Sequence, residues 1–350
     1  YIFIILMTFV QVSCVHESYP PHTPDNVPDG YTKIEFAANV TDPTLVSTRA
    51  VDPDGLDVNN MTLFCFNEFG LFISTETAEL VRHTAVDGVS DSGVYTATIP
   101  SHTRIIHFLA NHSEGLYDES NFPGQTESMV IANMEGGSGM LVYWSRFEMD
   151  ADSSDDIRTQ LSKLKYKIGN DTYDGIKLIR NQAKVTIAEW NNDKFIVTGF
   201  RTVNIPAFGT VAPHHPQEHF HIVDNWETTE DFITLPDNQA LMSDIIDVNT
   251  KNEDYIFESE NSGDRQVSVI IRGHAPGKTQ ADDKYYRIVM QREDGSNFMI
   301  RRNHHYKIQI TGMLTYPSNT FEEALIAPAS NNAWISIDEW VNEITDGIRT

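Results

Sequence analysis

Alternation of apolar and polar residues along the chain predicts β-strands. The clearest case is Tyr31 to Val40, which has an apolar face made of Ile34, Phe36, Ala38 and Val40. The residues between them, Lys33, Glu35 and Asn39, are polar. Because successive side chains of a strand point to opposite sides, this segment predicts a strand with one face in a core.

Short β-branched and aromatic runs, separated by Gly, Asn, Asp and Pro, continue the strand pattern through the rest of the chain. The predicted strands are Met61 to Phe66, Gly93 to Ile99, Ile105 to Ala110, Met140 to Trp144, Ile176 to Trp190, Lys194 to Phe200, Gln266 to Arg272, Tyr285 to Met290 and His305 to Thr311. Their spacing predicts an all-β protein built of β-sandwiches with a few short helices.

One segment fits two kinds of local structure, and another predicts a turn. Asp156 to Ile168 carries apolar residues at helical spacing after an Asp-rich start, but its second half, Lys163 to Ile168, alternates as a strand would. Helix and strand therefore both stay open there. Asp294-Gly295 predicts a hairpin turn between strands at Tyr285 to Gln291 and Phe298 to Gln309.

The first fourteen residues form an apolar run that ends at Ser13-Cys14. About a dozen apolar residues are too few to cross a bilayer as a helix, but this is the length of the apolar part of an export signal. A cysteine after a small residue is where lipoprotein signals are cut and acylated, so Cys14 is a candidate lipid anchor. The interval 15–30 is rich in proline and predicts an extended tether.

Length, net charge and cysteine content limit the number of domains, the kinds of partner and the disulfides to be expected. A chain of 350 residues predicts two domains, and the acidic cluster 150–156 with the turn-rich 170–175 places their boundary near 170, giving units of 31–170 and 171–350. The formal net charge of -25 argues against nucleic-acid binding, because the phosphate backbone is repelled. Only Cys65 remains after Cys14, so no disulfide within the exported chain is expected.

Catalytic and metal-binding motifs are weak. His215, His219 and His221 are the best candidates for a metal site, but nearby prolines oppose a regular helix and no His-Glu-x-x-His arrangement is present. A solvated loop is the better interpretation. We therefore expect that the protein has no enzymatic activity and no cofactor. A metal-dependent surface hydrolase is a distant alternative.

Four segments, in order along the chain, resemble the Bacteroidales-type fimbrillins, the subunits of type V pili. They are Arg104-Ile-Ile-His-Phe-Leu-Ala-Asn111, Lys177-Leu-Ile-Arg-Asn-Gln-Ala-Lys-Val-Thr-Ile187, Val203-Asn-Ile-Pro-Ala-Phe-Gly-Thr-Val-Ala-Pro213 and Arg302-Asn-His-His-Tyr-Lys-Ile-Gln-Ile-Thr-Gly312. The resemblance implies two tandem transthyretin-like β-sandwich domains, a surface location at the outer membrane, and a pilus assembled by strand exchange.

In that family an arginine-specific protease cuts after the first strand and removes it. Here the first Arg of the chain is Arg49, which lies in a polar segment soon after Tyr31 to Val40. We expect cleavage between Arg49 and Ala50, which would free the strand that carries Ile34, Phe36, Ala38 and Val40. The groove left behind would then need another strand.

The candidate donor is the segment 333–342, which carries Ile335, Ile337 and Val341 on one face and Trp334 and Trp340 on the other. Such a strand would join another subunit by β-strand addition. The expected partners are other fimbrial subunits, the protease and a surface ligand. The alternatives are a fimbrial tip adhesin, an uncut anchor, or another ligand-binding surface lipoprotein.

Overall fold

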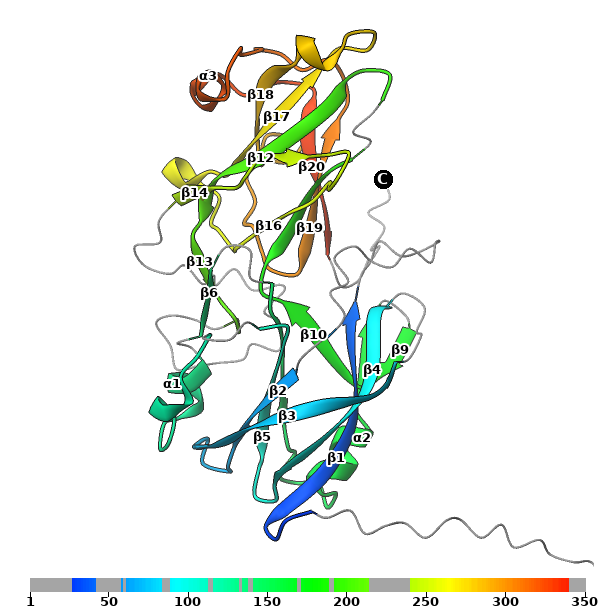
Figure 1. Ribbon diagram of the computed structural model, residues 1–350, viewed down its shortest axis with the longest axis vertical. Helices are drawn as coiled ribbons and strands as arrows, with labels where there is room; N and C mark the ends of the chain where they lie inside the picture. Colours follow the sequence, from blue (N-terminus) through cyan, green and yellow to red (C-terminus); the bar gives the residue numbers. More distant parts are fainter. Residues whose placement is uncertain are drawn as a thin grey trace, which may run out of the picture.

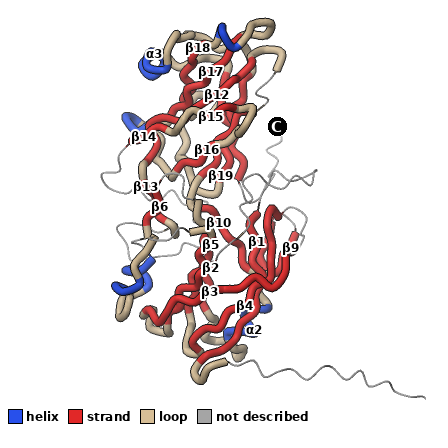
Figure 2. Tube along the Cα trace, viewed as in Figure 1, coloured by secondary structure: helices blue, strands red, loops and turns tan. Residues whose placement is uncertain are grey.

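The computed structural model describes residues 27–41, 58, 61–83, 89–112, 116–131, 134–137, 141–168, 171–188, 192–213 and 240–339. These residues form two β units joined end to end (Figures 1 and 2). The cleavage pair Arg49-Ala50, the candidate anchor Cys14 and the histidines at 215, 219 and 221 lie outside them. No described helix is both long and apolar enough to cross a membrane.

The first unit is a closed barrel of seven strands. In spatial order the strands are β1 (Tyr31–Thr41), β10 (Ile176–Arg180), β7 (Tyr143–Glu148), β5 (Ile105–Ala110), β2 (Met61–Phe66), β3 (Phe72–His83) and β4 (Val89–Pro100). Its core contains the inward side chains of these strands, including Leu63, Phe108 and Leu178. The mostly β composition agrees with the expected all-β class, but the strands of this unit close into a barrel, where the sequence pattern predicts a β-sandwich.

The second unit contains two open sheets packed around a second core. One sheet has the order β16 (Asp254–Ile256), β11 (Ala183–Ile187), β19 (His304–Ile310) and β20 (Ala333–Glu339). The other has the order β14 (Ala240–Met242), β12 (Ile196–Pro206), β17 (Ser268–His274) and β18 (Lys284–Val289), with β15 (Ile246–Asp247) also paired to β12.

Short helices and ribbons complete the described fold. The helices are α1 (Glu127–Ile131), α2 (Ile157–Ser162) and α3 (Phe321–Ile326), with 3-10 turns at η1 (Glu119–Asn121), η2 (Gly263–Arg265) and η3 (Gln280–Asp282). The two-stranded ribbons pair β6 (Glu135–Gly137) with β13 (Phe208–Thr210), and β8 (Lys165–Ile168) with β9 (Asp171–Asp174).

Both structures that were open for Asp156 to Ile168 are present, one after the other. The Asp156 side chain caps α2 by accepting a hydrogen bond from the Thr159 amide at 2.8 Å. The helix buries Ile157 and Leu161 and stops at Ser162, after which β8 begins. The two periodicities that compete in this segment therefore belong to its two halves.

The prediction of a hairpin around Asp294-Gly295 is wrong, although the chain does turn there. Gly295 has a φ of +81°, and the Arg292 amide donates to the Ser296 carbonyl at 2.9 Å. The flanking strands, however, lie in different sheets, because β18 pairs with β17 while β19 pairs with β11 and β20. The chain crosses between the sheets through Phe298 and Ile300, which are buried in the second core.

The change from the first unit to the second comes later than the sequence pattern places it. The expected second unit starts at residue 171, but β10 pairs with β1 and β7 of the barrel. The chain enters the second unit at β11, after Asn181 and Gln182. The turn-rich segment near 170 marks the β8–β9 ribbon instead of the connection between units.

Reciprocal hydrogen bonds fix this connection on both sides. Toward the barrel, the Asn181 amide donates to the Val142 carbonyl, and the Val142 amide donates to the Asn181 side chain, both at 3.0 Å. Toward the second unit, the Asn303 amide donates to the Gln182 carbonyl at 2.9 Å, and the Arg180 amide donates to the Asn303 side chain at 3.0 Å. Asn181 and Gln182, which connect the two units, are therefore hydrogen-bonded to both of them.

A buried arginine also stabilises the connection between the two units. Arg302 has no exposed side-chain surface and forms a two-point ion pair with Glu258, with contacts of 2.8 and 2.5 Å. Its guanidinium also donates to the Val211 carbonyl and the Thr210 hydroxyl, both at 2.8 Å. Val211 packs in a core cluster with Phe64 and other barrel residues, so Arg302 connects the two units through the β13 segment.

Candidate strand-exchange site and the edge of the last strand

The expected removable strand, β1, is a full member of the barrel (Figure 1). It pairs antiparallel with β4 along its whole length, from Tyr31 opposite Pro100 to Thr41 opposite Val89. On its other edge it pairs in parallel with β10, but only from Ala38 to Val40. Most of its backbone hydrogen bonding is therefore with a single neighbour, β4.

The inward face of β1 fills part of the first core. Ile34, Phe36 and Ala38 are 0%, 2% and 1% exposed. The Phe36 ring lies 5.9 Å from the Tyr95 ring and 5.0 Å from the Phe108 ring, measured between centroids. Burial of each large side chain contributes about 1.5 to 3 kcal/mol, so a barrel without β1 would expose an apolar slot to water.

Side chains around the rim hold β1 with a few polar contacts. The Thr96 hydroxyl donates to the Ile34 carbonyl at 3.0 Å, and Arg158 of α2 donates to the Thr32 hydroxyl at 3.0 Å. Near the other end, the buried Asn39 side chain donates to the Asp174 carbonyl at 2.9 Å. These contacts connect β1 to β4, α2 and β9.

The candidate donor strand is folded into the second unit. β20 pairs antiparallel with β19 over seven residues, from Ala333 opposite Ile310 to Glu339 opposite His304. Ile335 is 2% exposed in the second core, and Ile337 packs against that core. Trp340 and Val341 lie outside the described residues. To act as a donor, β20 would have to leave β19 and withdraw Ile335 from the core.

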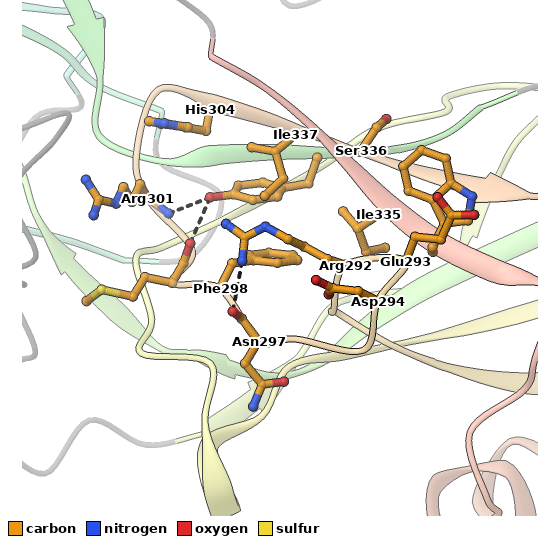
Figure 3. Close-up of a pocket in the computed structure, with 13 residues that line it drawn as sticks. Arg292, Glu293, Asp294, Asn297, Phe298, Arg301, His304, Ile335, Ser336 and Ile337 are labelled. Carbon is orange, nitrogen blue, oxygen red and sulfur yellow. Dashed lines mark hydrogen bonds between the residues drawn. The ribbon is translucent and has the colours of Figure 1, made fainter. Parts of the chain in front are cut away.

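A groove of about 1420 Å³ lies between β20, the start of β19 and the segment 292–301 (Figure 3). Its lining includes Phe298 and Tyr306, whose rings stack with centroids 5.3 Å apart. Arg292 lies 5.5 Å above the Phe298 ring. Ile335 and Ile337 line the β20 side. The groove therefore has an aromatic floor, formed by Phe298 and Tyr306, and charged side chains around it, such as Arg292 and Glu293.

Hydrogen bonds fix the aromatic floor in place. The Arg301 amide donates to the Tyr306 hydroxyl at 2.8 Å, and that hydroxyl donates to the Met299 carbonyl at 3.2 Å. Burial raises the pKa of Tyr306 well above its ordinary value, so the hydroxyl stays protonated and keeps donating. On the β20 edge, the Ile335 amide donates to the Gln291 carbonyl at 3.2 Å.

The other residues with candidate chemistry have structural roles where the structure describes them. His304 donates through Nδ1 to the Arg302 carbonyl at 2.8 Å, and His305 Nε2 lies 2.9 Å from the Thr186 hydroxyl. Burial raises the pKa of the Cys65 thiol to about 12. Within the described ranges, no group of three or more His, Cys, Asp or Glu side chains could hold a metal ion.

A buried histidine network that the sequence analysis did not single out connects α1 to the barrel. Trp144 Nε1 donates to His107 Nδ1 at 3.1 Å, so His107 carries its proton on Nε2 and donates to Glu127 at 2.7 Å. Glu127 also accepts from Arg146 Nε at 2.6 Å. His107 lies within the Arg104 to Asn111 motif, but no local spacing connects it to Glu127.

This network predicts a loss of stability in mild acid. Burial lowers the pKa of His107 below 6.5, although the hydrogen bond to Glu127 opposes the shift. Burial raises the pKa of Glu127, but hydrogen bonds from His107 and Arg146 outweigh it and lower that pKa to about 2. The unfolded chain therefore takes up a proton on His107 below pH 6.5 and on Glu127 below pH 4.5, and the folded chain does not.

We expect the unfolding free energy to fall as the pH drops below 6.5, with His107 contributing up to about 1.4 kcal/mol per pH unit. Replacement His107→Gln should lower stability at pH 7.5 but flatten its slope between pH 6.5 and 5. Thermal unfolding of both chains across this range measures the slope. Equal slopes for the two chains would show that His107 does not titrate on unfolding.

No known family model matches the chain. It is 23% identical to the major fimbrium tip subunit FimE of Porphyromonas gingivalis, over 95% of this chain and 56% of that protein. The chain thus spans little more than half the length of this curated relative.

Among solved structures, the chain is similar to a candidate cell adhesion protein from Parabacteroides distasonis, with a TM-score of 0.51 and 16% identity. That match covers 89% of this chain and 97% of the other. The tip fimbrial protein Mfa3 from Porphyromonas gingivalis matches with a TM-score of 0.47 and 11% identity, over 88% of this chain and 100% of the other. The resemblance of this chain to Bacteroidales fimbrial subunits, expected from its motifs, is confirmed.

Proposed function

We propose that the chain is a structural subunit of a type V fimbria that supports adhesion and is assembled by protease-triggered strand exchange. The observation that carries this proposal is β1. It is the first described strand, its apolar face lies in the barrel core, and it has one full-length neighbour. Such a strand can be exchanged for another of similar shape without changing the rest of the barrel.

The proposed steps begin with export as a lipoprotein through Cys14, which would hold the precursor at the outer membrane surface. An arginine-specific protease then cuts between Arg49 and Ala50. Loss of β1 empties the slot, and a strand from a neighbouring subunit fills it. A transthyretin-like β-sandwich is proposed for the second unit, which has two open sheets around one core, whereas the first unit is a closed barrel. No catalytic step by this chain is part of the proposal.

The donor role of the segment 333–342 stays a prediction. Its described part, β20, would have to break seven residues of pairing with β19 before it could enter another subunit. The groove beside β20 supports such a role, because residues 334–337 of the strand line it and are reached from it.

A second candidate function is a fimbrial tip subunit, which contacts a surface ligand. The similarity to a tip subunit from Porphyromonas gingivalis favours it. A tip subunit would still need its β1 slot filled, so both candidates share the first steps. They differ in whether 333–342 donates to another subunit.

Replacement of Arg49 tests the cleavage step. In cells that carry the protease, the Arg49→Ala chain should keep residues 31–41 and stay out of fimbriae, whereas the wild-type chain should begin at Ala50. Amino-terminal sequencing of extracted fimbriae and of the outer membrane measures both. Replacement Arg82→Ala, in the exposed part of β3, is the matched control and should not change processing. Fimbriae containing the uncut Arg49→Ala chain would contradict the proposal.

A further inference from the structure

We infer that the β1 slot selects its strand by side-chain size, and that the selected strand comes from a subunit different from this one. The slot accepts two large apolar residues two positions apart, then two consecutive small residues, then a hydrogen-bond donor. This inference rests on the proposed function and specifies the partner at the same site.

The two large positions are those of Ile34 and Phe36. Both side chains are almost fully buried, and Phe36 lies between the rings of Tyr95 and Phe108. A small residue at either place would leave a cavity in the first core. An incoming strand therefore needs large apolar residues at both.

The first small position is that of Ala37, because the backbone of Gly175 lies directly against it. A Cβ built on Gly175 would lie 2.6 Å from the Ala37 Cβ and 2.4 Å from the Ala37 carbonyl oxygen. Gly175 also has a φ of +106°, which favours glycine. The corner before β10 therefore leaves little room for a side chain longer than that of Ala37.

The second small position is that of Ala38, which is 1% exposed in the core and lies opposite Gly93 of β4. The space beside Gly93 is already taken, since a Cβ built there would lie 2.7 Å from Leu80 Cδ1 and 3.0 Å from the Tyr95 ring. A branched side chain in place of Ala38 would overpack this corner.

The hydrogen-bond donor position is that of Asn39. This side chain is 3% exposed, and its Nδ2 donates to the Asp174 carbonyl at 2.9 Å. An acceptor-only side chain, such as an ionised aspartate, would face that carbonyl without a hydrogen bond. Amide and hydroxyl side chains satisfy the position.

The segment 333–342 of this chain does not meet these requirements. A strand that keeps the pairing of β1, antiparallel to β4 and parallel to β10, must run in the direction of β1. If Ile335 and Ile337 occupy the two large positions, Glu339 falls at the place of Ala38. A shift of two residues puts Ile337 there instead and Asp338 at the place of Asn39.

Peptide exchange into the cut chain tests the inference. The full chain, with a site-specific protease sequence in place of residues around Arg49, is cut and incubated with fluorescent peptides in mild urea. A peptide of residues 31–41 should enter the slot, as should its Glu35→Leu form, because Glu35 faces solvent. The Ala38→Leu form and a peptide of residues 333–342 should each bind at least tenfold more weakly by fluorescence anisotropy.

Each result decides a separate point. Equal binding of 333–342 and 31–41 would overturn the different-subunit assignment, and equal binding of the Ala38→Leu form would overturn size selection. If no peptide enters, including 31–41, the proposed function fails and the strand assignment fails with it. Thermal unfolding of the uncut Ala38→Leu and Glu35→Leu chains then decides size selection alone, because only the first should lower the melting temperature.

Discussion

Replacement Phe36→Asp should open the barrel along β1. The carboxylate would lie between the rings of Tyr95 and Phe108, neither of which offers it a positive charge. Loss of the ring costs about 3 to 5 kcal/mol, and an unpaired buried carboxylate costs several kcal/mol more. The substitution thus replaces the largest apolar contribution of β1 to the first core with a penalty, so the strand should detach from β4 and β10 while the second unit stays folded.

Hydrogen exchange detected by mass spectrometry can separate the two units. In the Phe36→Asp chain, the amides of β4 and β10 should lose protection, and those of β17 should keep it. Lys33→Asp is the matched control, because it adds the same carboxylate to the exposed face of the same strand. Wild-type protection of β4 in the Phe36→Asp chain would show that β1 does not hold the barrel closed.

Strands whose inward face is strongly apolar can be predicted from the sequence. Met61–Phe66 and Ile105–Ala110 match the expected ranges, and both are buried along nearly their whole length. The sequence pattern does not predict β3, because most of its residues are polar and Ala78 is the only one of its described side chains that is buried. It is a strand because its backbone pairs with both β2 and β4 and so closes the barrel.

Pairing between distant segments is harder to predict than the strands themselves. The single expected strand at Ile176 to Trp190 is two strands in two units, β10 and β11, broken where Asn181 and Gln182 bond to different partners. The Arg302-Asn303 part of the family motif forms the joint between the units, a role that depends on Glu258 and the β13 segment. No local pattern reveals such contacts.

The strand-exchange site, too, can be predicted from the sequence only in part. The inward positions of β1 can be read from alternation, because burial depends on the period of the strand. The small-residue corner near Gly93 and Gly175 cannot, because it depends on where β4 and β10 approach β1. The burial of β20 in its own unit depends likewise on its pairing with β19.

A disulfide that fastens β1 in its slot would abolish assembly. Glu35 of β1 and Thr96 of β4 are directly opposite each other in the antiparallel pair, so cysteines at these two positions are close enough to bridge. The native Cys65 is buried and should not compete. After cleavage at Arg49, the bridged β1 cannot leave, and no strand from a neighbour can enter.

The most direct measurement of strand exchange is therefore the amount of fimbriae formed by the Glu35→Cys, Thr96→Cys chain before and after reduction, with Glu35→Cys alone as the control. We expect the oxidised double variant to be cut, to keep residues 31–41 and to form no fimbriae, with assembly restored by a reductant. Normal assembly of the oxidised, fully bridged chain would contradict the exchange of β1.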